Sequence, residues 1–574
     1  MTPPFKKKTA GVQLPTHPWK NEGLVTYGYL TPEQDLMPQQ FSIPPQRVIP
    51  IVFIPGIMGS NLRLKPDRQK IMGRKDNLAW RPDFKTFCVS MMNTGPEERQ
   101  LLLDPDATEV DTYDPVENPT GSADETSDPR NAKVSGNVFY HRPISTTSPL
   151  LVGDPPTQPN RRTPAQKARA RGWGEVFYSS YGDVLQLCEE KLNGAFMHGV
   201  LNAWWREIVD VDPKEWQASS KPALTPLTVE TLRAAVSDCW FPVHAMGYNW
   251  LESNESSGTK LAGRVERLIR QYKAEAYQCE KVILVTHSMG GLVARALVHP
   301  SMGKLHDKVL GIVHGVMPAM GAAATYKRMR CGFEGLAAGV LGKDGKCVTA
   351  VLANAQGGLE LLPSTAYGNA WLVIKHKGES IFSLPEKGDP YEEIYKVQGR
   401  WYGLLTREWI NPGKLQKRGF ERTTTLLDLA KKFHTKMAGV YHTNSYAHYG
   451  ADTTRPAWQS VTWAIQSADF SDLKQAKVIL DLANGTVQLA DKNPRLVSNL
   501  GVPHPIARLQ PPTEPGDETV PLFSADDQLR SGKFKGIFRQ TGYEHQASYK
   551  DEAALRSTLY SLIQIASTMN WSRK

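Results

Sequence analysis

The clearest hydrophobic pattern in the chain is an aliphatic run that stops at a polar turn and is followed by helical spacing. Residues 282–285 read Val-Ile-Leu-Val, which predicts a strand buried on both faces. Apolar residues within 292–297 then recur at the spacing of one helix face. Between them, Thr286-His-Ser-Met-Gly290 predicts a sharp turn with Ser288 at its centre. The pattern therefore predicts a strand, a tight turn carrying a serine, and a helix.

Similar patterns surround this unit. Residues 48–54 and 309–314 are aliphatic runs that predict further strands, and 241–250 reads as a strand end with its loop. Apolar residues between 261 and 272 fall on one face of a predicted helix. Strands that alternate with helices form a parallel sheet covered on both faces, so the pattern predicts the α/β class.

The chain is too long for one simple core, because single cores stop growing well below its 574 residues. Long polar or irregular stretches interrupt the periodic segments, which indicates large insertions. The predicted division is an N-terminal extension at 1–46, a core made of 47–62, 172–325 and 511–574, an insertion at 63–171, and a cap domain at 326–510.

Two patterns inside the predicted cap are informative. Runs at 478–482 and 486–489 flank Asn484-Gly485, which predicts a hairpin with a type I′ turn. Residues 333–341 are apolar and glycine-rich, which suits either a lid helix over the site or an ordinary buried helix.

Composition narrows the classes of function. The net charge of +10 suits an anionic membrane surface, and no nucleic-acid-binding signature accompanies it, so we expect no nucleic-acid partner. The six cysteines form no C-x-x-C pair, which argues against a disulfide scaffold or a zinc site but leaves a Cys331–Cys347 bridge open. Neither a signal peptide nor a run of 18 apolar residues is evident. We therefore expect synthesis in the cytoplasm and export without a cleaved signal.

The turn around Ser288 suits nucleophilic catalysis. A serine hydroxyl needs a base, usually histidine, and the base needs a carboxylate to orient it. On a strand–turn–helix nucleophile the partners follow in the order acid, then histidine. Asp517 lies at the tip of a predicted turn, with Glu518 as a rival, and His545 is the one histidine after it. Ser288, Asp517 and His545 are therefore the predicted catalytic residues.

The glycine-rich loop after the 48–54 strand precedes Ser288 in the order expected for an oxyanion-binding loop. We expect the backbone N–H of Met289 to pair with that of Ile57, or alternatively Met58, as oxyanion donors. The spacing of His434, His442 and His448 matches no helical zinc pattern, so no metal is expected. The predicted chemistry also requires no cofactor.

The motifs resemble those of the α/β-hydrolase lipases of the lecithin:cholesterol acyltransferase group and the similar GPI-inositol-deacylase-like enzymes. The segments that carry this resemblance are Ile51–Leu62, Thr286–Gly291, Pro318–Gly321 and Gly516–Pro521. Thr286 departs from the glycine usual at its position, which we expect the turn to tolerate. The large insertions resemble bacterial type VI secretion lipase effectors, which are antibacterial phospholipases.

This resemblance implies an α/β-hydrolase fold with large cap insertions and a serine phospholipase of type A that cleaves acyl esters of membrane phospholipids. It also implies a cognate immunity protein, loading onto a secretion spike or adaptor, and action at the periplasm or membrane of a target cell. Two alternatives remain. One is a lipid acyltransferase with the same three residues, and the other is a non-catalytic binding or adaptor protein on a hydrolase scaffold.

Overall fold

A computed structural model of the chain describes residues 45–112, 164–490 and 505–572, except 84, 198, 336 and 467–471. It also describes the backbone of three strands nearer the N-terminus, which pair in one antiparallel sheet: β1 (Thr16–Pro18), β2 (Leu24–Tyr29) and β3 (Pro38–Ile43). Most of the predicted 63–171 insertion beyond residue 112 lies outside the described residues.

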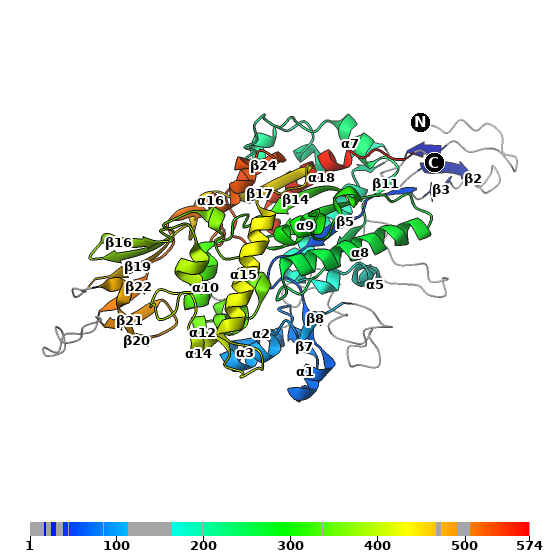
Figure 1. Cartoon of the computed structure of the whole chain (residues 1–574). Coiled ribbons are helices and arrows are strands. Elements are labelled where there is room, and N and C mark those ends of the chain that lie inside the picture. The colour runs from blue at the N-terminus through cyan, green and yellow to red at the C-terminus, as the bar shows by residue number, and fades with distance from the viewer. Residues whose placement is uncertain are drawn as a thin grey trace.

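A six-stranded sheet forms the centre of the molecule, and every pair of neighbouring strands in it is parallel. In spatial order its strands are β12 (Val243–Ala245), β5 (Ile51–Ile54), β13 (Val282–His287), β14 (Val309–Gly315), β17 (Ser445–Gly450) and β24 (Phe534–Gln540). This arrangement confirms the predicted α/β class (Figure 1).

Proline shortens the first predicted strand. Pro50 separates β4 (Arg47–Val48) from β5, and Pro242 separates β11 (Cys239–Trp240) from β12. Proline has no backbone N–H to donate to a sheet. The two short strands nevertheless pair in parallel with each other, so they continue the edge of the sheet past the interruption.

Helices cover both faces of the sheet. On β13, Val282 and Leu284 pack into the hydrophobic cluster that contains α8 (Asn254–Ala274) and α9 (Gly290–Val298). Ile283 and Val285 pack into a second cluster, with α6 (Tyr178–Asn193), α7 (Val229–Val236) and α18 (Glu552–Ala566). Because successive side chains of a strand point to opposite faces, a sheet covered on both sides requires the continuous aliphatic run seen here.

The predicted cap at 326–510 is not wholly outside the core, because β17 lies between β14 and β24. Residues 445–450 form a fully buried strand, although their polar and aromatic side chains do not give the hydrophobic pattern of one. Its place in the core is evident only from the strands on either side of it. The rest of the region contributes α10 (Ala323–Cys331), α11 (Ala338–Leu341), α12 (Gly345–Leu352), α13 (Gln356–Leu359), α14 (Arg407–Ile410) and α15 (Phe420–Met437).

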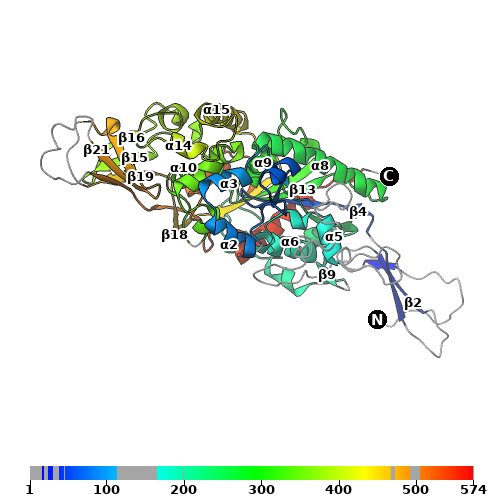
Figure 2. The ribbon, with the colours of Figure 1, turned by 90° about the horizontal axis from the view of Figure 1, so that it is seen from below.

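The cap region also contains a second six-stranded sheet, which Figures 1 and 2 show at one end of the molecule. Its strands, in spatial order, are β16 (Glu379–Leu384), β15 (Leu372–His376), β19 (Val461–Ile465), β22 (Ile506–Leu509), β21 (Thr486–Ala490) and β20 (Lys477–Asp481). The predicted hairpin is confirmed in β20 and β21, but its turn type is wrong. Positive φ occurs at Ala483 and Gly485 rather than at Asn484 and Gly485, and Leu482 N–H donates to Thr486 C=O, so the loop is longer than a type I′ turn.

The described part of the 63–171 insertion packs against the cap. Its elements are α1 (Pro66–Ile71), α2 (Lys85–Asn93), α3 (Pro96–Leu102) and α5 (Pro164–Ala170), with a small sheet of β6 (Leu62–Leu64), β7 (Leu78–Trp80) and β8 (Thr108–Val110). Helix α2 contacts α11, and α3 contacts α12. The two insertions are therefore joined to each other as well as to the core.

The remaining short elements are β9 (Phe196–Met197), β10 (Val200–Leu201), α16 (Leu522–Ala525) and α17 (Asp527–Arg530). Cys331 and Cys347 are both buried free thiols, so the disulfide left open by the sequence does not form. A search of the described residues finds no helix whose length and apolar character would let it cross a membrane.

Candidate active site

Ser288 lies in a strained turn between β13 and α9, with φ of 52°. Its N–H donates to Gly315 C=O on the neighbouring strand at 2.8 Å, which fixes the turn to the sheet. A Cβ at Gly290 would lie 2.4 Å from Ile54 O, so only glycine permits this close approach. Thr286 belongs to extended strand β13, and this conformation explains why the position accepts a β-branched residue.

The three residues predicted to be catalytic meet at the carboxyl edge of the central sheet. Ser288 Oγ lies 2.8 Å from His545 Nε2, and His545 Nδ1 lies 2.8 Å from Asp517 Oδ2. The other oxygen of Asp517 accepts hydrogen bonds from Thr519 N–H at 3.1 Å and Val520 N–H at 2.7 Å. Since the carboxylate accepts from Nδ1–H, Nε2 is free to accept the serine proton.

Each of these side chains is supplied by a different strand. Ser288 follows β13, and His545 follows β24. Asp517 follows the short strand β23 (Glu514–Gly516), which pairs with β18 (Asp452–Ala457) just beyond β17. Four strands of the second sheet, β19 to β22, therefore lie in the chain between β17 and Asp517.

Glu518, the rival to Asp517, instead forms an ion pair with Arg455 at 2.5 Å. The three histidines weighed for a metal lie in separate surroundings. His434 bonds the Tyr391 hydroxyl at 2.8 Å, the His442 ring stacks near His306, and His448 packs on Tyr549. Within the described residues, no group of three histidine, cysteine or acidic side chains is placed to hold a metal ion.

The loop after β5 lies beside the turn that carries Ser288. A Cβ on Gly56 would lie 3.0 Å from Ser288 Cβ, and Met58 has a φ of 59°. In the described part of the chain, neither Ile57 N–H nor Met289 N–H donates to a protein acceptor. Met289 also stands at the N-terminal end of α9, where the helix dipole favours negative charge. Both donors are therefore available for an anion.

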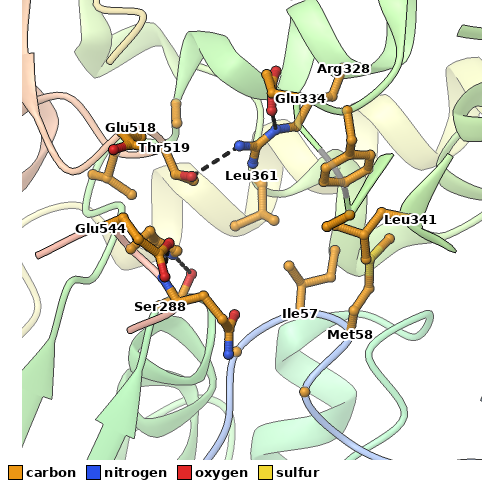
Figure 3. Close-up of a pocket in the computed structure, with 18 of the residues that line it drawn as sticks. Ile57, Met58, Ser288, Arg328, Glu334, Leu341, Leu361, Glu518, Thr519 and Glu544 are labelled. Atoms are coloured by element: carbon orange, nitrogen blue, oxygen red, sulfur yellow. Dashed lines mark hydrogen bonds and ion pairs between the residues drawn. The ribbon is translucent and has the colours of Figure 1, made fainter. Parts of the chain in front are cut away.

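Ser288 and His545 open into a cavity of about 720 Å³ (Figure 3). Much of its wall is apolar and comes from both insertions as well as from the core. The apolar lining includes Ile57, Met58, Trp80, Phe177, Pro318, Phe333, Val340, Leu341, Leu361 and Trp458. A large apolar cavity with a few polar groups at one end suits a substrate with a hydrocarbon chain.

The segment 333–341, called the lid segment below, contributes Phe333, Val340 and Leu341 to this cavity. The sequence predicts either a lid helix or a buried helix over this segment, but only Ala338–Leu341 is helical. Gly332 and Gly335 adopt positive φ, which breaks the helix before it starts. A hydrogen bond from Phe333 N–H to Gly342 C=O at 2.9 Å closes the base of the segment.

Sequence reasoning assigned no role to His287 or Tyr181. His287 Nε2 lies 2.9 Å from the C=O of His545, and its Nδ1 lies 3.1 Å from the Tyr181 hydroxyl. The same hydroxyl accepts from Gly56 N–H at 3.3 Å. Burial lowers the pKa of His287 well below its usual value, so the ring is neutral. The position of His287 next to Ser288 was the only sequence signal for this contact.

Comparison with known proteins gives a match to one family model and matches to solved structures. Residues 259–333, which run from α8 past Ser288 into the lid segment, match the family model of the PGAP1-like alpha/beta domain. A chain in the crystal structure of the Tle4-Tli4 complex is 31% identical, with a TM-score of 0.70, and the match covers 91% of this chain and 99% of that one. A search of curated proteins finds no match. Given that identity over nearly the full length of both chains, the protein belongs to the same family, the α/β-hydrolase lipases that include type VI secretion effectors.

Proposed function

We propose that this lipase is a serine phospholipase of type A in which Ser288, His545 and Asp517 form the catalytic triad. The observation that carries this proposal is the unbroken pair of 2.8 Å contacts from Ser288 through His545 to Asp517 at the end of an apolar cavity. The family relationship supports lipid ester chemistry, and the cavity supports an acyl chain as part of the substrate.

In the first half of the reaction, Ser288 Oγ attacks the ester carbonyl carbon while His545 Nε2 takes its proton. The N–H groups of Met289 and Ile57 stabilise the oxyanion that forms. When the carbon–oxygen bond breaks, His545 gives the proton to the departing alkoxide oxygen, which leaves as the hydroxyl of a lysophospholipid. The acyl group then remains on Ser288 as an ester.

In the second half, water attacks the acyl-enzyme and gives its proton to His545. Collapse of the second intermediate releases a fatty acid and restores Ser288. Asp517 keeps the proton of His545 on Nδ1 and stabilises the charged imidazole. An acyltransferase would use the same residues and replace water with an alcohol.

A fluorophosphonate probe and mass spectrometry of the products test this proposal together. The wild type is expected to label and to convert phospholipid into free fatty acid and lysophospholipid. Ser288→Ala should lose the label and reduce the rate by roughly 10⁴- to 10⁶-fold. His545→Ala added to Ser288→Ala should cause almost no further loss, because the triad acts as a unit. Acyl transfer to an added alcohol as the main reaction would favour the acyltransferase, and absence of label and turnover would favour a binding protein.

We propose in addition that the chain is an exported antibacterial effector that a Tli4-like immunity protein neutralises. The solved relative is a complex of Tle4 with Tli4, which supports a partner of this kind. We further propose that the protein is loaded onto a secretion spike or adaptor and acts in the periplasm of the target cell. Targeting the wild type to the periplasm of a test cell should be toxic, whereas Ser288→Ala should not be. Equal toxicity of both proteins would contradict an enzymatic effector.

A further inference from the structure

The active-site cavity contains one arginine, Arg328 of α10, and no other arginine or lysine lines the cavity in the described part of the chain. Figure 3 shows its guanidinium across the cavity from Ser288. Its side chain is only 17% exposed, so a charge placed there is held in a confined and largely apolar space. Electrostatic attraction to an anion is stronger in such a place than in open water.

Two contacts hold the guanidinium in a fixed orientation. Arg328 Nε donates to Glu334 at 3.1 Å, and its Nη2 donates to the Thr519 hydroxyl at 2.9 Å. The ring of Phe333 lies 4.8 Å from the guanidinium carbon. Arginine has five N–H donors, so these bonds leave several of them without an acceptor among the described residues.

The charged side chains around Arg328 do not fully neutralise its positive charge. Glu334 also pairs with Lys327 at 2.6 Å, so one carboxylate is shared by two cations. Among the other acidic residues of the cavity, Glu518 pairs with Arg455. Glu544 lies near Ser288 in Figure 3, and its carboxylate accepts a hydrogen bond from Gln546 N–H. Positive charge therefore faces the cavity on the side away from the nucleophile, and negative charge lies beside the nucleophile.

We infer that Arg328 binds the phosphodiester of the substrate and so selects glycerophospholipids over neutral acylglycerols. This inference rests on the proposed phospholipase function. A phosphodiester lies only a few bonds from each glycerol ester, and guanidinium groups bind its oxygens in a fork. Glu544 repels the same phosphodiester, so the headgroup is directed toward Arg328 while the acyl chain lies along Ile57, Met58 and Leu341.

The test compares two soluble substrates with the same short acyl chains, a diacylphosphatidylcholine and a diacylglycerol, both below their aggregation thresholds. Arg328→Gln should lower kcat/KM for the phospholipid by about tenfold to a hundredfold, mainly through KM, because a hydrogen bond to a charged group is lost. Its kcat/KM for the diacylglycerol should stay within about twofold of wild type. Arg328→Lys should recover part of the phospholipid activity, since it keeps the charge and loses the fork.

Glu334→Gln is the control for the lid segment, because it loses the ion pair with Lys327 while its amide oxygen can still accept from Arg328 Nε. The variant should not lower the preference for the phospholipid over the diacylglycerol, because the positive charge of Arg328 remains. An equal loss on both substrates in Arg328→Gln would overturn the inference and make Arg328 a residue that only holds the lid segment. Unchanged activity on both would also overturn it. Inhibition of diacylglycerol hydrolysis by inorganic phosphate, relieved in Arg328→Gln, would assign the site to free phosphate instead.

These outcomes are separate from failure of the proposed function. If Ser288 were not a working nucleophile, the wild type would hydrolyse neither substrate and would not label with fluorophosphonate. Labelling of Arg328→Gln at the wild-type rate shows that Ser288, His545 and Asp517 are intact in the variant. Loss of labelling in Arg328→Gln would mean that the arginine supports the triad itself, which contradicts a role confined to the headgroup.

Discussion

His287 connects three parts of the active site that are far apart in the sequence. A carbonyl oxygen can only accept, so the 2.9 Å contact places the proton of His287 on Nε2, directed at His545 C=O. Its Nδ1 then accepts from Tyr181, whose oxygen accepts from Gly56 N–H. On its other side, His545 N–H donates to Asp517 C=O at 2.9 Å. The peptide that carries His545, the proposed catalytic base, is therefore held from both directions.

We predict that His287→Ala lowers kcat by roughly tenfold or more with little change in KM, because a base displaced by a fraction of an ångström transfers protons less efficiently. His287→Gln should restore part of the rate, since its amide N–H can still donate to His545 C=O. Steady-state kinetics with a soluble ester and the thermal midpoint of each variant provide the measurement. A rate unchanged in His287→Ala despite a lower thermal midpoint would show that the contact serves folding only.

Helix α8 begins at a junction with the cap region, and a buried carboxyl group holds the two together. Glu360, just after α13, accepts from Asn254 N–H at 2.8 Å and from Gln356 at 2.9 Å. Burial raises the pKa of Glu360 to about 8 from its usual 4.5. The neighbouring His434 donates from Nε2 to the backbone oxygen of Glu360 at 2.7 Å, so it does not bond the carboxyl group.

This group makes stability depend on pH with a definite sign. Between pH 4.5 and about 8 the unfolded chain has released the proton of Glu360 while the folded chain retains it, so the free energy of unfolding falls as pH rises. We predict that Glu360→Gln removes this part of the decline, because the amide keeps an acceptor and cannot ionise. Thermal midpoints of wild type and variant from pH 5 to pH 8 provide the check. If the thermal midpoints of the two proteins changed with pH in parallel over that range, Glu360 would ionise as it does in the unfolded chain.

The two insertions contact each other and both line the active-site cavity. Arg99 of α3 is 2% exposed and donates to the backbone oxygens of Gly339 and Val340, both at 2.8 Å. The first insertion therefore holds the lid segment, while Glu334 ties its other end to α10. The lid segment is therefore held near both of its ends by a small set of contacts.

We predict that an aggregated lipid surface activates the enzyme, because apolar side chains such as Phe333 and Val340 gain an apolar environment when the segment opens. Turnover of a long-chain ester should jump at its aggregation threshold, whereas turnover of a short-chain monomeric ester should saturate smoothly. Anionic vesicles should increase the effect, given the net charge of +10, and salt should weaken that increase. Smooth saturation for both esters, with no effect of salt on anionic vesicles, would leave a permanently open site as the explanation.

Local sequence determined the strand, turn and helix that carry Ser288. The strand before Ser288, the glycine that allows the close approach to Ile54, and the helix after it are all specified within a few residues, because each depends on side-chain periodicity or a single φ value. Asp517 and His545 were also accessible from the sequence, since chain order limits the candidates that can follow the serine. The contacts at 2.8 Å place them where that order requires.

Tertiary structure alone decided the features that depend on distant neighbours. Strand β17 has no apolar alternation, and it is a core strand because β14 and β24 complete its hydrogen bonds on both sides. The apolar run of the lid segment suits a helix, but positive φ at Gly332 and Gly335 confines the helix to Ala338–Leu341, where Arg99 holds it. A hydrogen bond to Thr519, 191 residues away in the chain, holds the guanidinium of Arg328 in the cavity. Such contacts cannot be read from periodicity, because their energy arises only when separated segments are packed together.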